Sequence, residues 1–148
     1  MVPFRGDHQA GVTTAQQEHL RIVAFTVLTG DREELRDMLS TWTAMAERMT
    51  RGDQTTEVGA LTDADADVND DPDNLLNQVP EDTGEALDLA SGNLTVTVGF
   101  GPSLFDDRFG LKDRKPEELE PLPKFPGDQL QDALCDGDIV IQACADDP

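Results

Sequence analysis

The acidic side chains near the middle of the chain have the spacing that comes closest to a functional motif. Asp63, Asp65 and Asp67 place carboxylates at alternate positions, which is how a calcium-binding EF-hand loop begins. The match then fails, because the sixth loop position needs a glycine but holds Val68, and the twelfth needs a bidentate glutamate but holds Asn74. The sequence therefore favours a solvated acidic loop over a calcium site.

The histidines and cysteines are too few and too scattered for a metal centre. His8 and His19 stand alone, and the cysteines do not lie at a zinc-ligand spacing from them. We interpret His19 as a structural or surface residue. Cys135 and Cys144 are interpreted as buried thiols, because an extended segment would hold their Cα atoms well beyond the ~7 Å that a disulfide tolerates.

Other sequence motifs for catalysis do not match either. The glycines at positions 99 and 101 resemble a dinucleotide fingerprint, but a leucine occupies the third glycine position and Pro102 opposes the usual helix start, so they indicate a turn. A hydrolase nucleophile elbow and a phosphate-binding loop are both absent from the sequence. The residues alone therefore do not indicate a self-contained active site.

The net charge of the chain limits the classes of partner that it can bind. The 148 residues carry 11 Lys and Arg against 31 Asp and Glu, a formal net charge of −20. Such a surplus repels phosphate backbones and anionic lipid headgroups, which excludes nucleic acid and membrane surfaces as partners. The sequence also lacks an apolar run near the ~20 residues that cross a bilayer, and its first residues lack the features of a signal peptide.

The apolar pattern predicts one strand followed by one helix in the first third of the chain. Residues 20–28 are rich in β-branched and aromatic types on both faces, which is typical of a central strand. Asp31 and Glu34 form a capping-box pattern, and Gly52 fits the left-handed position that ends a helix. Between them, apolar residues recur at steps of three and four and include Trp42, so we expect this helix to lie on a sheet.

The rest of the chain predicts a long loop and two more strands. Between residues 52 and 107 there are fourteen acidic residues and no Lys or Arg, which indicates a loop. Residues 94–100 alternate apolar side chains with Thr95 and Thr97, which predicts a strand with one face buried and the other less so. Residues 112–131 contain four prolines and predict an ordered, irregular connection, and residues 138–145 predict a third strand.

The predicted order, strand, helix, strand, strand, indicates an α+β, ferredoxin-like fold. It supplies β-α-β-β of a β-α-β-β-α-β unit, and we expect a C-terminal part outside this chain to supply the last helix and strand. Without them the apolar first strand would be an open edge, which invites aggregation. The organisation expected is an N-terminal arm at 1–18, strand and helix at 19–52, an acidic loop at 53–92, and two strands with the proline-rich connection at 93–148.

Three segments resemble dye-decolorizing peroxidases. Residues 4–12, F-R-G-D-H-Q-A-G-V, look like the family's N-terminal signature. Residues 94–105, L-T-V-T-V-G-F-G-P-S-L-F, followed by R-F-G-L at 108–111, look like its second strand and turn. Residues 137–147, G-D-I-V-I-Q-A-C-A-D-D, fit its third strand. The segments keep the family's order over nearly the whole chain, so the resemblance is specific.

The resemblance implies one part of a haem b peroxidase built from two ferredoxin-like halves, which oxidises dyes and phenolic compounds with hydrogen peroxide. In the family a distal Asp within Gly-x-x-Asp-Gly, a distal Arg and a proximal His do the chemistry. None of the three can be placed in this sequence. We therefore expect them in the C-terminal part, and expect this chain alone to be non-catalytic.

Two residues of the N-terminal signature are candidates for contact with the cofactor. His8 and Gln9 are polar neighbours on an arm that can fold across the haem edge and donate hydrogen bonds to a propionate. The alternative is that the same pair ties the arm to the protein body. The acidic loop has two interpretations as well: it shapes access or attracts cationic substrates, or it is only a solvated face.

The hypothesis from sequence is thus the scaffold part of a haem peroxidase, with hydrogen peroxide, aromatic reductants and the C-terminal part as its partners. Homo-oligomerisation is left open. The resemblance also implies export by the twin-arginine route, with a cytoplasmic location as the alternative, and a proposed iron-release role for some relatives. The rival hypothesis is a non-catalytic ferredoxin-like binding or assembly module.

Overall fold

The computed structural model describes residues 1–55, 89–131 and 135–147, and it contains the predicted strands and helix in the predicted order. The elements are β1 (His19–Phe25), α1 (Arg32–Met49), β2 (Thr95–Phe100) and β3 (Ile139–Ala145). Two short 3₁₀ helices, η1 (Pro102–Leu104) and η2 (Lys112–Arg114), follow β2. The aspartates considered for calcium, at 63–67, lie outside the described residues.

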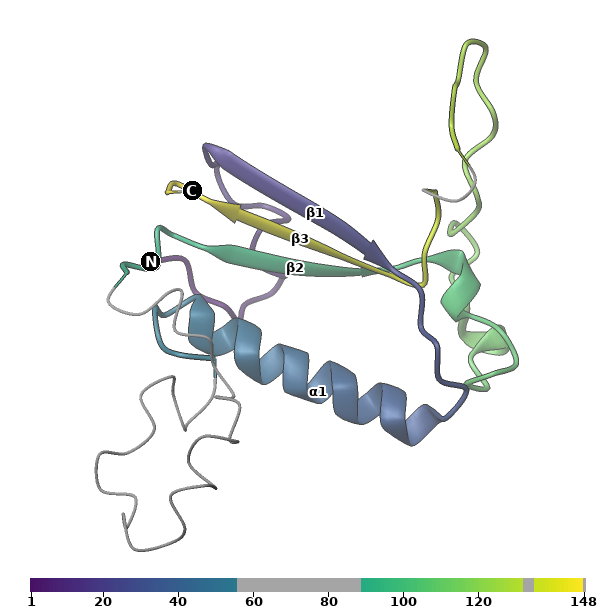
Figure 1. The fold of residues 1–148 in the computed structure, drawn as a ribbon, viewed down its shortest axis with the longest axis horizontal. Helices are drawn as coiled ribbons and strands as arrows, with labels where there is room; N and C mark the ends of the chain where they lie inside the picture. The colour runs from purple at the N-terminus through teal and green to yellow at the C-terminus, as the bar shows by residue number, and fades with distance from the viewer. Residues whose placement is uncertain (56–88, 132–134, 148) are drawn as a thin grey trace, which may run out of the picture.

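The strands form one antiparallel sheet in the order β1-β3-β2 (Figure 1). Ile141 at the centre of β3 pairs with Val23 of β1 on one side and with Val98 of β2 on the other. The helix α1 lies along one face of this sheet (Figure 1). This is the α+β, ferredoxin-like arrangement that the sequence predicts.

Strand β1 is shorter and more exposed than its sequence indicates. It ends at Phe25 instead of continuing to residue 28, because the Val27 N–H donates to the carboxylate of Asp138, at 2.8 Å, and not to a neighbouring strand. Within the described residues β1 is an edge strand, and Leu20 and Ile22 are 54% and 63% exposed. The two-sided apolar pattern of a central strand thus occupies an open edge in this chain.

The helix α1 begins and ends where its sequence predicts. The Asp31 carboxylate caps the first turn by accepting the N–H of Glu33 at 2.7 Å and that of Glu34 at 3.4 Å. Thr29 completes the cap, because its hydroxyl accepts the Asp31 N–H and donates to the Glu34 carboxylate. At the other end Gly52 adopts φ +81°, the left-handed conformation expected of a terminating glycine.

The threonine face of β2 is the better-covered one at its start, contrary to the sequence prediction. Thr95 is 0% exposed, whereas the apolar Val96 and Val98 are only half-buried. The cover is the N-terminal arm: the Thr97 hydroxyl donates to the Ala10 carbonyl at 2.7 Å, and the Thr95 hydroxyl donates to the side chain of Gln17 at 2.9 Å. Alternation along β2 could not reveal a cover that comes from residues 78 or more positions away.

The buried core gathers at the end of the sheet where β1 ends and β3 begins. It consists of Val27, Leu35, Leu104, Phe109 and Ile139, with Met38, Leu39 and Trp42 of α1 packed against it. At this point the turn after β2 approaches the turn before β3 so closely that a Cβ on Gly101 would lie 2.0 Å from the Gly137 carbonyl oxygen. Both cysteines are free thiols, as the sequence predicts, but they are half-buried and not buried.

The close approach at Gly101 gives a test of the fold. Gly101→Ala forces two backbone segments apart, so we expect the free energy of unfolding to fall by about 1–3 kcal/mol. Gly30→Ala is the matched control, because nothing lies within 4 Å of a Cβ built there. Urea unfolding of both variants makes the comparison, and an equal effect of the two substitutions would contradict the packing described.

Candidate functional site

The N-terminal arm, residues 1–18, joins the helix to both ends of β2. Near its start Arg5 forms an ion pair with Glu47 of α1 at 2.6 Å. In its middle Gln9 and Ala10 bond to β2, and near its end the Gln17 side chain donates to the carbonyls of Asn93 at 2.6 Å and Cys144 at 3.0 Å. The arm that carries both candidate cofactor residues is therefore held at three places.

Gln9 lies against the outer edge of β2. Its amide nitrogen donates to the Val98 carbonyl and its amide oxygen accepts the Val98 N–H, both at 3.0 Å. A carboxamide has the same donor and acceptor as a peptide group, so Gln9 pairs with this strand edge as a neighbouring strand would. This contact is the tie to the protein body that the alternative interpretation of Gln9 describes.

His8 lies at the rim of a cleft between α1 and the sheet. The cleft has a volume of 860 Å³ and a largely apolar lining. Its walls are Trp42, Met45 and Met49 of α1, with Phe25, Val96, Val98 and Ile141 of the sheet, and Phe4, Arg5 and His8 at the arm. Trp42 closes one end of it by packing on Phe25, with 5.3 Å between ring centroids. A hollow of this kind suits an apolar or aromatic group.

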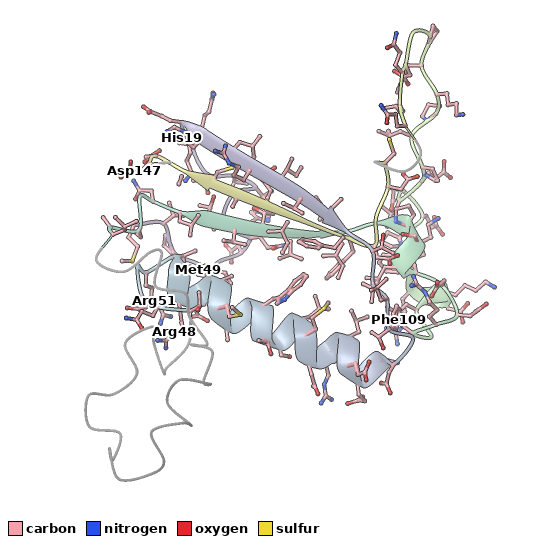
Figure 2. All side chains as sticks on the ribbon, in the orientation of Figure 1. His19, Arg48, Met49, Arg51, Phe109 and Asp147 are labelled. Atoms are coloured by element: carbon pink, nitrogen blue, oxygen red, sulfur yellow. The ribbon has the colours of Figure 1, made fainter. Side chains whose placement is uncertain are left out.

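Charged side chains fix the arm at the end of α1 that carries Met49, opposite the end near Phe109 (Figure 2). Glu47 pairs there with both Arg5 and Arg51. The hydrogen bond from Arg5 lowers the pKa of Glu47, against the opposing effect of burial, and the charges of Arg5 and Arg51 lower it further. The same hydrogen bond raises the pKa of Arg5, so this cluster stays ionised at neutral pH.

A second charged cluster lies in the core at the opposite end of α1. The side chain of Asp138 is 4% exposed, and it accepts the Val27 N–H at 2.8 Å and Arg108 at 3.1 Å. Burial alone would raise the pKa of Asp138, but hydrogen bonds from Ser103, Val27 and Arg108 outweigh it and hold that pKa below its ordinary value. Arg108 also donates to Asp106, which raises its own pKa.

Sequence reasoning missed this Arg108 and Asp138 cluster. The available signals were weak: Arg108 is the first basic residue after the acidic stretch, and Asp138 stands directly before a strongly apolar strand. An acid at that place is buried only when it has partners, and those partners are 30 and 111 residues away. We assign the cluster a role in holding the fold and not in chemistry.

The two histidines of the described residues lie at different hollows of the surface. His8 is exposed at the rim of the 860 Å³ cleft. His19, at the start of β1 (Figure 2), lines a separate hollow of 260 Å³. His8 is exposed and His19 is half-buried. Across residues 1–55, 89–131 and 135–147, we also find no group of His, Cys, Asp and Glu that could hold a metal ion.

Helix length gives a further observation. Among the helices that the structure describes, none combines the length and the apolar character needed to cross a membrane.

Comparisons with known proteins agree on one family. The family model described as Dyp-type peroxidase, N-terminal, matches residues 9–148. The deferrochelatase of Escherichia coli strain K12 is 38% identical over 144 residues, which is 97% of this chain and 30% of that protein. The deferrochelatase of Yersinia pestis, strain Nepal516, matches with the same identity and coverage.

Solved structures give the same result. A complex of DtpA from Streptomyces lividans described as oxyferrous/water mixed superposes with a TM-score of 0.77 at 33% identity, covering 99% of this chain and 33% of that one. A DyP-type peroxidase from Cellulomonas bogoriensis gives 0.68 at 39% identity, covering 99% and 34%. The chain spans about a third of the length of the relatives that it matches.

The pairing of Gln9 with Val98 is open to direct measurement. In Gln9→Ala the Val98 amide loses its partner, so we expect its hydrogen exchange to accelerate, with a stability loss of about 1 kcal/mol because the contact is exposed. Gln16→Ala, at an exposed position of the same arm, is the control and should leave Val98 exchange unchanged. Unaltered exchange in both variants would contradict the contact.

The buried carboxylate predicts a pH dependence of stability. Folding lowers the pKa of Asp138 from its ordinary 3.8, so its contribution is present above that value and is lost as the pH falls through the lower folded pKa. Asp138→Asn should cost about 1–3 kcal/mol at neutral pH and progressively less in acid.

Denaturant midpoints of the wild type and Asp138→Asn across this pH range test the dependence. Asp107→Asn, whose carboxylate is 85% exposed, serves as the control and should change stability little at any pH. A difference between wild type and Asp138→Asn that stays constant down to strongly acidic pH would contradict the assignment.

Proposed function

Because this chain belongs to the Dyp-type peroxidase family, whose N-terminal domain it matches over residues 9–148, we propose that it is the scaffold part of a haem-dependent peroxidase. The observation that carries the proposal is coverage: 97% of this chain aligns with 30% of a 38% identical relative. The proposed reaction is the oxidation of dyes and phenolic compounds by hydrogen peroxide. Haem b, bound mainly by a C-terminal part, supplies the redox chemistry.

The exposed strand β1, at the edge of the sheet, supports the scaffold role. Apolar side chains of β1, above all Leu20 and Ile22, are more than half exposed, and the backbone of β1 is paired on one edge only within the described residues. A helix and a strand from the C-terminal part would complete the β-α-β-β-α-β unit and cover these groups. The haem ligand and the distal Asp and Arg are then expected in that part, because the sequence lacks the Gly-x-x-Asp-Gly segment that carries the distal Asp in the family.

We further propose that His8 and Gln9 act at the haem edge in different ways. The His8 imidazole is exposed at the rim of the cleft, beside Arg5, so it is able to donate a hydrogen bond to a propionate of a haem held by the C-terminal part. Gln9, whose amide pairs with Val98, holds the backbone that carries His8. His8 is thus the contacting residue and Gln9 the positioning residue.

The peroxidase proposal is tested on the protein that carries this chain together with its C-terminal part. We expect a Soret band and a dye oxidation that requires hydrogen peroxide. Intact-mass spectrometry of the same sample identifies which polypeptides are present. A colourless preparation that contains only the 148-residue species would instead support the rival hypothesis, a non-catalytic ferredoxin-like module.

The haem-edge role of His8 has its own readout. In His8→Ala, measured in the haem-loaded protein, we expect the propionate vibrations in resonance Raman spectra to shift and haem dissociation to become faster. His19→Ala, at the separate hollow, is the matched control and should leave both unchanged. If haem occupancy and the propionate vibrations do not differ between His8→Ala and the wild type, His8 does not contact the haem.

The curated relatives favour a second candidate function, which is the removal of iron from haem. The 38% identical proteins are named deferrochelatases, a name that denotes iron removal, whereas the solved neighbour from Cellulomonas bogoriensis, at 39% identity, is named a peroxidase. Identity at this level does not separate the two activities. Porphyrin fluorescence separates them, because removal of iron from haem leaves a fluorescent metal-free porphyrin and dye oxidation does not.

Location and assembly remain predictions of the resemblance. We propose export by the twin-arginine route, with the cytoplasm as the alternative, and we leave homo-oligomerisation open. The net charge of −20 supports the expectation that nucleic acid and anionic membrane surfaces are not partners.

A further inference from the structure

Residues 115–131, here called the proline-rich loop, project from the body of the protein. They follow η2 and rise from the end of the sheet where β1 ends, on the side away from α1 (Figure 1). Every residue of this loop is exposed except Leu119, which is half-buried. A segment of this length that packs so little on its own domain needs another explanation for its order.

The tip of the proline-rich loop is a tight turn closed by two hydrogen bonds. The N–H of Phe125 donates to the Asp128 carboxylate at 2.8 Å, and the N–H of Asp128 donates back to the Phe125 carbonyl at 3.1 Å. Pro126 and Gly127 form the turn, and Gly127 has φ +91°, a conformation that favours glycine. A tip fixed in this way loses little conformational freedom when it binds.

The loop presents large apolar side chains to solvent. Leu122 is 85% exposed, Phe125 56% and Leu130 68%. Three such residues on one projecting, proline-stiffened segment are typical of a contact surface, because isolated apolar residues are common on surfaces but ordered apolar projections are not.

The outer face of the sheet is bare along β1, whereas the N-terminal arm covers it over β2. Phe25 and Ile141 line the cleft under α1, so the alternate residues of β1, among them Leu20 and Ile22, point to the opposite face. Those two are 54% and 63% exposed. In Figure 1 the proline-rich loop lies on the side of the sheet away from α1, and the bare face is on that same side. The loop and the bare face are thus both available to one large partner.

We propose that the proline-rich loop is a docking element for the remaining part of the same peroxidase polypeptide, with Leu122 and Phe125 as its apolar anchors. This rests on the proposed function. About two thirds of the length of the relatives lies outside this chain, which provides a partner of sufficient size. A second copy of this chain is disfavoured, because each copy carries a net charge of −20 and like-charged surfaces repel.

Hydroxyl-radical footprinting of the full-length peroxidase tests this assignment. The oxidation rates of Leu122 and Phe125 in the native protein are compared with their rates in the urea-denatured protein, over a dilution series that reaches the monomer. We expect severalfold protection of both side chains at every concentration. Rates equal to those of the denatured protein would show a free loop, and protection that is lost on dilution would show a second copy in its place.

Variants and the haem signal make the outcome specific. Phe125→Ser should increase the oxidation of Leu122 severalfold, whereas Glu118→Gln, an exposed position of the same loop, should not. A Soret spectrum of the same wild-type sample separates the two proposals. A haem-loaded protein with an unprotected loop overturns the docking alone, whereas a protected loop without any Soret band overturns the peroxidase proposal and leaves the docking in place.

Discussion

The buried carboxylate of Asp138 is the contact on which the rest of this fold depends. Its side chain accepts the Val27 N–H and Arg108, while its backbone donates to the Phe25 carbonyl and accepts the Gly101 N–H, each of these two at 2.8 Å. The end of β1, the turn after β2 and the start of β3 therefore meet at one residue. A carboxylate is buried at low cost only when such partners arrive together, so the folding of these three segments is coupled.

These contacts of Asp138 explain why one end of the domain has a packed core and the other end has an open cleft. Near Asp138 the sheet, η1 and the first half of α1 share a core that includes Ile139, at 1% exposure, and Phe109, at 2%. Towards the far end of α1 the contact with the sheet gives way to the 860 Å³ cleft, and the N-terminal arm spans the gap through Arg5 and Glu47. The arm is thus a second attachment, and an exposed one, which salt weakens more easily than the contacts of Asp138.

The sequence was sufficient for the ends of the helix and for the existence and order of the strands. Asp31 and Gly52 mark the ends of α1 because capping involves neighbours along the chain, and alternation along β2 and the apolar run of β3 identify these strands. It was insufficient wherever distant segments meet. The cover over Thr95, the pairing of Gln9 with Val98 across 89 residues and the role of Arg108 depend on how the chain folds back, and similarity to a family pointed to His8 and Gln9 without specifying what they contact.

The open side of the sheet makes the scaffold more than a passive support. The fully buried apolar side chains among the described residues are few, whereas Leu20, Ile22 and Val23 of β1 are half or more exposed. A small domain with such a balance gains much of its stability only when another part covers it. In a two-part peroxidase the free energy gained by covering β1 belongs to both parts, so cofactor binding in one part stabilises the fold of the other. In the proposed two-part peroxidase, this apolar edge, unfavourable in isolation, is therefore what couples the scaffold to the chemistry.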